Sequence, residues 1–521
     1  MSGVRLAEAV AALSLGIDVG MGQPLEQGLR TCLVATTVAR RVGLDDDDTR
    51  RVFHLSLLRH VGCTAESDQA AWFLGDEVAF RRGAITLDFT RPSAMLPYLV
   101  RTVGAGGSAL GRARHVGRVL AGSKRFLASM DSVCETAQML ATRLGFDDVV
   151  QRGLWQVFEH WDGGGLPGRV GGEEIVLPAR FVAAAELFEG LCRLEGPERA
   201  AAVVSERRGR AFAPAVVDGL LAAAGDLVPV FDQPSVWDDV LALEPPPRRA
   251  LSDEQLDDVL LAVADFADLK SSFTVGHSRG VADLASAAAA TAGLPDADGV
   301  RLRRAALVHD VGRVGVSAAV WGKPGALTRD EWEKVRLHPY YTERVLTRPA
   351  ALGELGRLAS LHHERVDGAG YHRAVAGTVL TLPARILAAA DGYRARTETR
   401  PHRPAMSSDQ AAASLRADVA EGRLDADAAE AVLAAAGHAG RRRRPSPPGG
   451  LTEREREVLA LVARGHSIRQ IAHTLGIAPK TADAHIQHIY TKLGVSTRAG
   501  ATLWAVEHGV AGAGADRETS R

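Results

Sequence analysis

The segments HDVGRVGV at residues 309–316 and HHERVDGAGY at residues 362–371 decide the fold of this 521-residue chain. Both place side chains that bind metals beside short glycine-containing turns. The chain around them supplies more ligands of the same kind, and the complete set is His277, His309, Asp310, His338, His362, His363 and Asp391. Imidazole and carboxylate together suit Mn, Fe or Zn better than a soft thiolate site would.

The adjacent pair His309-Asp310 can give one ligand to each of two ions, or the carboxylate can bridge them. Two ions about 3.5–4 Å apart hold the attacking and leaving oxygens of a phosphoryl transfer, and a metal-bound water with a pKa near ~7 is the nucleophile. A single histidine is usually a surface or core residue. Five histidines in motif context, followed by Asp367-Gly368, instead predict a dinuclear site.

An internal repeat organises the first 440 residues. LPAR at 177–180 recurs at 382–385, and Asp162-Gly163 recurs as Asp367-Gly368, both displaced by 205 residues. Upstream, Gly43-Leu44 recurs as Gly293-Leu294, displaced by 250 residues, so the first copy carries about 45 extra residues in its middle. The repeat predicts two tandem copies of one helical domain.

The first copy lacks the ligands. Its aligned positions hold Gln27, Arg59-His60, Val157-Phe158 and Glu186 where the second copy has His277, His309-Asp310, His362-His363 and Asp391. Gln, Arg, Val and Phe cannot rebuild a divalent site there. We therefore expect a non-catalytic first domain that serves sensing or subunit contact.

Composition and charge agree with a helical chain that has a local role on nucleic acid. Aromatic residues are 5% and alanine is abundant, which favours helices. The net charge of −1 argues against a chain that coats nucleic acid along its length. Four dispersed cysteines without a CxxC pair, no signal-like N-terminus and no long uncharged apolar stretch predict a cytoplasmic protein without a membrane span.

Residues 250–435 resemble an HD-GYP domain, the metal-dependent phosphohydrolase class that degrades cyclic di-GMP. The matching stretches are GHSRGVA (276–282), HDVGRVGV (309–316), KPGALT (323–328), HP (338–339), HHERVDGAGY (362–371), LPARILAAADGY (382–393) and RPHR (400–403). The resemblance implies an all-helical HD fold and a metal centre held by the seven ligands named above, with Asp310 bridging and acting in catalysis.

Departures from the family pattern bear on the substrate. Arg313 stands where the family has lysine, and it implies a catalytic contact to phosphate. His372 replaces the proline of the GYP signature, and Phe273 replaces the glutamate of three-metal members, which implies two divalent ions, Fe or Mn. By resemblance, the substrate contacts are Arg313, Asp367, Gly368, Gly370, Tyr371 and Arg400.

The C-terminal segment 451–509 predicts a helix-turn-helix domain. Thr452 with Glu455 forms a capping-box pattern, and Gly465 and Gly476 end two short amphipathic runs. A third helix begins near Pro479, and spacing puts four of its residues on one face: Asp483, Ala484, Gln487 and His488. A small helical protein-interaction domain is the alternative.

The same segment resembles a LuxR-type helix-turn-helix domain through LTEREREVL, IAHTLGIAPKTADAHI and IYTKLGVSTR. The resemblance implies double-stranded DNA as partner, base contacts from Asp483, Ala484 and Gln487, and phosphate contacts from Lys480, Thr481 and Lys492. It also implies dimerisation through a fourth helix at about 497–508, and hence a homodimer.

We therefore expect an all-α chain of tandem HD-like domains followed by a LuxR-type domain. The expected parts are a degenerate HD-like domain (1–245), an HD-GYP domain (246–440), a basic linker (441–450), the DNA-binding domain (451–512) and a tail (513–521). The linker arginines 441–444 fit a solvated linker and a phosphate-contacting arm equally well.

The expected function is hydrolysis of a cyclic dinucleotide such as cyclic di-GMP, coupled to DNA binding and transcription control. The alternative is a catalytically weak, metal-containing nucleotide sensor that acts as a ligand-gated transcription factor. A third option is hydrolysis of another phosphoester, because HD domains host varied phosphohydrolases.

Overall fold

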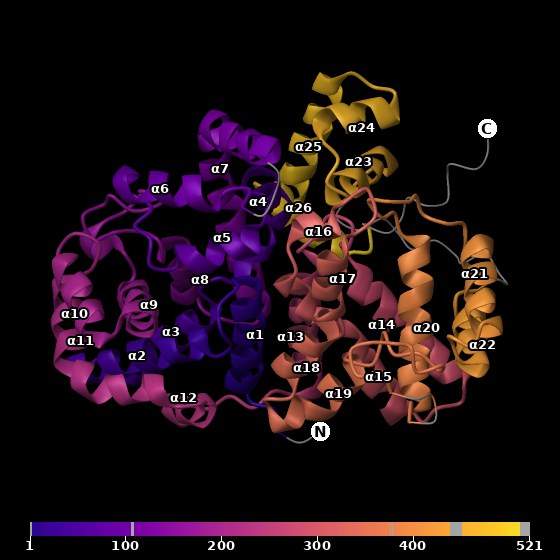
Figure 1. Cartoon of the computed structure of the whole chain (residues 1–521), viewed down its shortest axis with the longest axis horizontal. Helices are drawn as coiled ribbons and strands as arrows, with labels where there is room; N and C mark the ends of the chain where they lie inside the picture. Colours follow the sequence, from indigo (N-terminus) through magenta and orange to yellow (C-terminus); the bar gives the residue numbers. More distant parts are fainter. Residues whose placement is uncertain (1–2, 106–108, 376, 378, 438–450, 511–521) are drawn as a thin grey trace. The chain divides into compact units, whose positions relative to one another are not determined.

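The computed structural model describes residues 3–105, 109–375, 377, 379–437 and 451–510 (Figure 1). These residues form helices and connecting turns, and they contain isolated bridges but no named strand. The all-α prediction is confirmed. The predicted linker 441–450 and tail 513–521 lie outside the described residues.

The chain divides into two compact units, Met1–Thr64 with Gln69–Val259, and Leu260–Arg521 with Ala65–Asp68. The division falls inside helix α13 (Asp253–Asp268), a few residues after the boundary we expected from the Pro-rich joint at 245–247. Pro246-Pro247 stops a helix locally, and the chain re-enters one at Asp253.

The first unit opens with three helices and a single 3-10 turn that prefigure the second unit. Its elements are α1 (Leu6–Gly20), α2 (Gln27–Val42), α3 (Asp46–Leu58), η1 (Val61–Thr64), α4 (Ser67–Leu74), α5 (Glu77–Ala84), α6 (Pro92–Thr102), α7 (Ala109–Arg143), α8 (Asp148–Gln156), η2 (Gly172–Glu174), α9 (Leu177–Glu195), α10 (Pro197–Glu206), α11 (Pro214–Leu227), η3 (Val228–Asp232) and α12 (Trp237–Leu243).

The HD part of the second unit repeats that order. Its elements are α13, α14 (His277–Thr291), α15 (Asp296–Val308), η4 (Val311–Gly315), α16 (Ala318–Trp321), α17 (Arg329–Arg336), α18 (His338–Leu346), η5 (Ala350–Leu352), α19 (Gly353–Ala359), α20 (Leu382–Thr397), α21 (Ser408–Ala420) and α22 (Ala426–Ala435). Helix α14 packs on α15, α20 and α22, and α15 packs on α19. These contacts bring the ends of α14, α15 and α19 toward α20.

The structure supports the repeat down to single hydrogen bonds. Helices α2 and α3 begin 250 residues before α14 and α15, and α8 and α9 begin 205 residues before α19 and α20. Asp18 accepts a 2.9 Å bond from the Gly28 amide, and Asp268 accepts a 2.9 Å bond from the Ser278 amide. The extra residues of the first copy form helices between η1 and α8.

One segment of the first unit, Pro214–Asp232, is long and apolar enough to cross a membrane by length and composition, with a mean hydropathy of 1.5. It spans α11 and η3. Helix α11 packs on α2, α9 and α10. Two of its aspartates pair with arginines, Asp218 with Arg208 and Asp226 with Arg41. These features are those of a partly buried helix in a packed bundle.

The C-terminal domain consists of α23 (Glu453–Ala463), α24 (Ile468–Leu475), α25 (Pro479–Leu493) and α26 (Arg498–Glu507). Thr452 and Glu455 form the expected capping box, and Gly465 and Gly476 take positive φ angles of 81° and 63° after α23 and α24. A core built around Val458, Leu459 and Ile489 holds the four helices together. The predicted helix order is confirmed.

Candidate functional site

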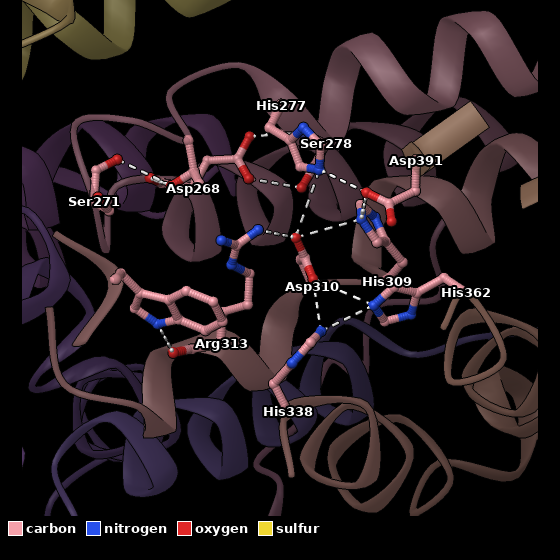
Figure 2. A network of polar contacts seen from close by, with 12 residues as sticks. Asp268, Ser271, His277, Ser278, His309, Asp310, Arg313, His338, His362 and Asp391 are labelled. Carbon is pink, nitrogen blue, oxygen red and sulfur yellow. Dashed lines mark hydrogen bonds and ion pairs between the residues drawn. The ribbon is translucent and has the colours of Figure 1, made fainter. Parts of the chain in front are cut away.

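Seven predicted ligands gather from five elements of the second unit (Figure 2). His277 begins α14, His309 and Asp310 follow α15, and His338 begins α18. His362 and His363 lie just after α19, and Asp391 lies on the buried face of α20. All except the half-exposed His363 are buried. The helix ends therefore place ligands separated by up to 114 residues in one centre.

Asp310 lies in the middle of this centre. Its Oδ1 atom is 3.3 Å from His338 Nε2 and 3.5 Å from His362 Nε2. Its Oδ2 atom is 3.4 Å from His309 Nε2 and 3.7 Å from His277 Nε2. One carboxylate thus faces two pairs of imidazoles, one pair from each oxygen, which is the arrangement of a bridging ligand.

Asp391 adds a second carboxylate. Its Oδ1 atom is 3.1 Å from His277 Nε2 and 3.8 Å from His309 Nε2. Its Oδ2 atom is 3.8 Å from His363 Nδ1. Two groups of three ligand atoms, each within 4.8 Å of one another, result: His277, His309 and Asp310, and His338, His362 and His363.

Backbone carbonyls fix the imidazole tautomers. The Nδ1–H groups of His309, His338 and His362 donate to the carbonyls of Ala306, Val335 and Ala359, at 2.6–2.7 Å. His277 Nδ1 contacts Glu398 Oε2 at 2.8 Å. Because a carbonyl can only accept, each Nε2 atom is left with its lone pair directed at the carboxylates.

The donor set fits divalent ions. His338 Nε2 and His362 Nε2 lie 3.0 Å apart, and both are acceptors, so no hydrogen bond joins two neutral rings in this geometry. The buried atoms His309 Nε2 and Asp310 Oδ1 have no hydrogen-bond partner. A cation between these lone pairs removes the repulsion and satisfies the buried acceptors.

The protonation states also suit metal binding. Burial lowers the pKa of His338 and of His362 to about 4 and that of His363 to about 3, so these rings are neutral at pH 7. Burial opposes the ionisation of Asp310, but the Arg313 guanidinium and His309 hold the pKa of that carboxyl well below its usual range. Neutral imidazoles and an ionised carboxylate are the metal-binding forms.

Arg313 is anchored at the edge of the centre. Its Nη1 atom donates to Asp310 Oδ2 at 2.6 Å, and its guanidinium carbon lies 4.2 Å from the centre of the Trp321 ring. The Trp321 indole N–H in turn donates to the Arg313 carbonyl at 3.2 Å. The cation is therefore held in place by a carboxylate and an aromatic face.

A cavity of about 500 Å³ opens beside the ligands. His362, His363 and Asp391 form one wall, and Tyr371 lies against His363 with ring centres 4.7 Å apart. The remaining wall includes Arg396, Arg403, Met406 and Ser414. This volume lies in the range of small-molecule sites, and it places a ligand directly against the candidate metal centre.

The other predicted substrate residues have different surroundings. Asp367 accepts from the Ala369 amide at 2.9 Å and pairs with Arg365, so it shapes its own turn. Gly368 has a φ of 73°, and a Cβ atom on Gly370 would lie 2.5 Å from the Arg365 amide nitrogen. Arg400 bonds to Glu398 and to the Phe273 carbonyl, behind His277. The glycines are needed for the loop's path, and Arg400 supports the ligand layer.

Sequence reasoning missed two supporting residues. Glu398 orients His277, and its pKa falls to about 2 because His277 and Arg400 outweigh its burial. Trp321 fixes Arg313. Neither belongs to a dense motif, so only the fold shows that Glu398 follows α20 and reaches back to α14.

The equivalent centre of the first copy is filled by a charge cluster. Glu186, on α9 as Asp391 is on α20, pairs with Arg59 at 2.6 Å and hydrogen-bonds His60. Phe158 packs against both, with the Arg59 guanidinium 5.1 Å from its ring centre. The aligned positions therefore come together as their counterparts do, but with an internal cation in place of ligands.

The helix-turn-helix residues occupy the exposed side of α25. Asp483, Ala484, Gln487 and His488 are exposed, whereas Ala482, Ile486 and Ile489 are buried in the domain core. Lys480 and Thr481 are exposed at the start of α25. Lys492 differs, because its Nζ atom bonds Glu455 Oε2 at 2.6 Å, so this lysine is already paired within the domain.

Comparison with known proteins agrees with both parts. An HD domain family model matches residues 126–213 and 262–428, and a model of bacterial regulatory proteins of the luxR family matches residues 450–505. The first match falls in both halves of the repeat.

Relatives with an assigned activity cover most of the chain. A 3'3'-cGAMP-specific phosphodiesterase 3 of Vibrio cholerae is 31% identical over 417 residues, which is 79% of this chain and 90% of that protein. A cyclic di-GMP phosphodiesterase response regulator of Xanthomonas campestris is 38% identical over 125 residues, 24% of this chain and 32% of its own. A crystal structure of the V. cholerae cyclic GMP-AMP phosphodiesterase V-cGAP3 is 28% identical, with a TM-score of 0.59, and covers 84% of this chain and 99% of that one.

The fold, the ligand centre and these similarities define the class, and the chain belongs to the HD domain phosphohydrolase family related to the cGAMP and cyclic di-GMP phosphodiesterases, the HD-GYP group. Within that group, this chain joins the HD architecture to a C-terminal LuxR-type helix-turn-helix domain.

Proposed function

We propose that this protein is a cytoplasmic phosphodiesterase that hydrolyses a cyclic dinucleotide at a centre of two divalent ions, Fe or Mn, and couples this site to transcription control through its DNA-binding domain. The observation that carries the proposal is the pair of ligand groups on either side of Asp310, next to a cavity of about 500 Å³. The relative that covers most of the chain is named for 3'3'-cGAMP, so this is the first substrate to test, followed by cyclic di-GMP.

The ions would be held by His277, His309, Asp310 and Asp391 on one side, and by His338, His362, His363 and the shared Asp310 on the other. When bound, they supply a polarised phosphate and an activated water. The chain itself supplies three further functions. Glu398 and the three backbone carbonyls keep the Nε2 lone pairs directed inward, Arg313 offers a fixed cation to a phosphate oxygen, and Tyr371 closes the cavity beside His363.

Turnover decides between the enzyme and the sensor alternative. Protein reconstituted anaerobically with Mn or Fe is given 3'3'-cGAMP, cyclic di-GMP and p-nitrophenyl phosphate in separate reactions, with products separated by chromatography. We expect a linear dinucleotide or mononucleotides from at least one cyclic dinucleotide and less product from the monoester. Tight nucleotide binding without products would replace the enzyme with a metal-containing sensor.

DNA binding is tested separately. Lys480 is exposed at the N-terminal end of α25, where a phosphate contact is expected. Lys480→Ala should weaken binding to every sequence and reduce the slope of log K against log salt by about 0.9, the value for one lost phosphate contact. Fluorescence anisotropy with a specific and a random duplex at several salt concentrations measures both quantities.

The matched comparison is Asp483→Ala on the same helix. Asp483 is exposed and acidic, so its loss should not reduce the salt slope, although it can change the preferred base. If Lys480→Ala leaves the affinity and the slope unchanged, the assignment of α25 as the DNA-contacting helix is wrong.

A further inference from the structure

Cys63 differs from the other three cysteines in its surroundings. Cys32, Cys134 and Cys192 are buried, whereas Cys63 is partly exposed. It lies on η1 of the first copy, three residues after His60, in the turn that corresponds to the catalytic-site turn η4 of the second copy. The charge cluster that replaced the metal ligands is therefore next to a thiol that solvent can reach.

The side chains around Cys63 form a chain of contacts. The Cys63 sulfur lies 3.7 Å from His60 Nδ1, and the opposite ring atom, His60 Nε2, bonds Glu186 Oε1. Thiol, imidazole and carboxylate thus follow one another in the order that activates a cysteine nucleophile. Glu186 fixes the imidazole and stabilises its protonated form.

The protonation directions agree with this geometry. Although burial opposes it, the Glu186 carboxylate raises the pKa of His60 to about 9. Burial also opposes thiolate formation at Cys63, but the hydrogen bond and charge of His60, with the charge of Arg81, lower the pKa of that thiol. Burial instead raises the pKa of Cys134 and of Cys192 to about 12.

Arg59 supplies an independent observation that indicates a ligand. Its side chain is 9% exposed, and only its Nη2 atom pairs with Glu186. The buried Nε and Nη1 atoms have no hydrogen-bond partner, and the guanidinium interacts electrostatically with Cys63. Buried guanidinium N–H groups without partners are costly, and an anionic oxygen beside the sulfur would satisfy them.

We propose that the vestigial centre of the first HD copy is a thiol-modification site, in which Cys63 reacts with small electrophiles of the peroxide class. The thiolate sulfur attacks one peroxide oxygen, an S–O bond forms and the O–O bond breaks. The sulfur is oxidised to a sulfenic acid and the peroxide is reduced to water. His60 gives its proton to the departing hydroxide, and Arg59 donates to the new oxygen on sulfur.

The test uses the full chain and its own cysteines as internal controls. Limiting iodoacetamide is added at pH 6 to 10, and alkylation of each cysteine is followed by peptide mass spectrometry. We expect Cys63 to react at least about tenfold faster at pH 7 than Cys192, because one unit of pKa changes the thiolate fraction about tenfold. The rate should rise with pH through a midpoint below 9, the ordinary value for the thiol.

The variant His60→Gln separates activation from simple exposure. It keeps a polar side chain but removes the imidazolium, so the midpoint for Cys63 should move upward, and the rate at pH 7 should fall about tenfold while the rate at pH 10 changes little. In a second arm, hydrogen peroxide followed by dimedone should label Cys63 as sulfenic acid and leave Cys192 unlabelled.

Three outcomes would overturn the proposal. These are equal rates at Cys63 and Cys192, an unchanged pH profile in His60→Gln, or fast alkylation without any sulfenic acid after peroxide. If the variant does not fold by circular dichroism, the profiles of Cys63 and Cys192 in the unaltered chain decide alone.

Discussion

The double variant His309→Ala/Asp310→Ala is expected to lose turnover of the cyclic dinucleotide by at least about 10³-fold. Asp310 faces four imidazole Nε2 atoms within 3.7 Å, so its removal separates the two ligand groups, and His309 belongs to one of them. Metal ions contribute several kcal/mol to such a transition state, and about 4 kcal/mol corresponds to roughly 10³-fold in rate. Initial rates with 3'3'-cGAMP, together with elemental analysis of bound Mn and Fe, measure the loss.

A graded variant and a surface control make this result specific. Glu398→Gln keeps a hydrogen-bond acceptor for His277 Nδ1 but removes its charge, so metal affinity should fall about 10–100-fold while the ligands remain. Glu430→Ala removes an exposed carboxylate paired with Arg416, far from the ligand set in sequence, and should leave both rate and metal content unchanged. Full turnover in the double variant would show that the reaction takes place elsewhere.

Metal removal is expected to destabilise the second unit and to spare the first. Without ions, the facing Nε2 atoms of His338 and His362 lie 3.0 Å apart, and two buried aspartates share the same centre. A ligand present at 1,000 times its dissociation constant stabilises by about 4 kcal/mol. For a unit of this size, each kcal/mol shifts the melting temperature by about 2–4 °C, so chelation should lower it by about 8–16 °C.

Calorimetry with and without EDTA measures this shift. The first unit has Arg59 and His60 paired with Glu186 where the second has its ligands, so its transition should not respond to the chelator. Added Mn should restore the upper transition, and the His309→Ala/Asp310→Ala variant should show no chelator effect. Superimposable scans of loaded and chelated protein would contradict a metal that contributes to folding.

The sequence predicted most of this architecture because its signals are local or repeated. The displacement of 250 and 205 residues between motifs corresponds to the spacing of paired helices, and the capping box at Thr452 and Glu455 begins the predicted helix. The seven proposed ligands lie together because each stands at a helix end or on the buried face of a helix, where its spacing is fixed by the fold.

Other features depend on contacts that no local pattern encodes. Glu398 approaches His277 across 121 residues, and Glu455 pairs with Lys492 across 37, so a lysine expected to contact phosphate has an internal partner. Asp367 resembles a substrate ligand in its motif, but it is engaged in its own turn. Such pairings follow from how helices pack, which the sequence specifies only through the complete fold.

The exchange of ligands for the Arg59, His60 and Glu186 cluster has a consequence for the history of the molecule. A duplicated metalloprotein inherits two copies of the same nutritional dependence, because each half needs scarce ions to mature. Once a tethered cation occupies one of the two centres, that half matures wherever the polypeptide is synthesised. Its neighbour alone then responds to trace-element supply, and the freed half can diverge toward a new chemical role.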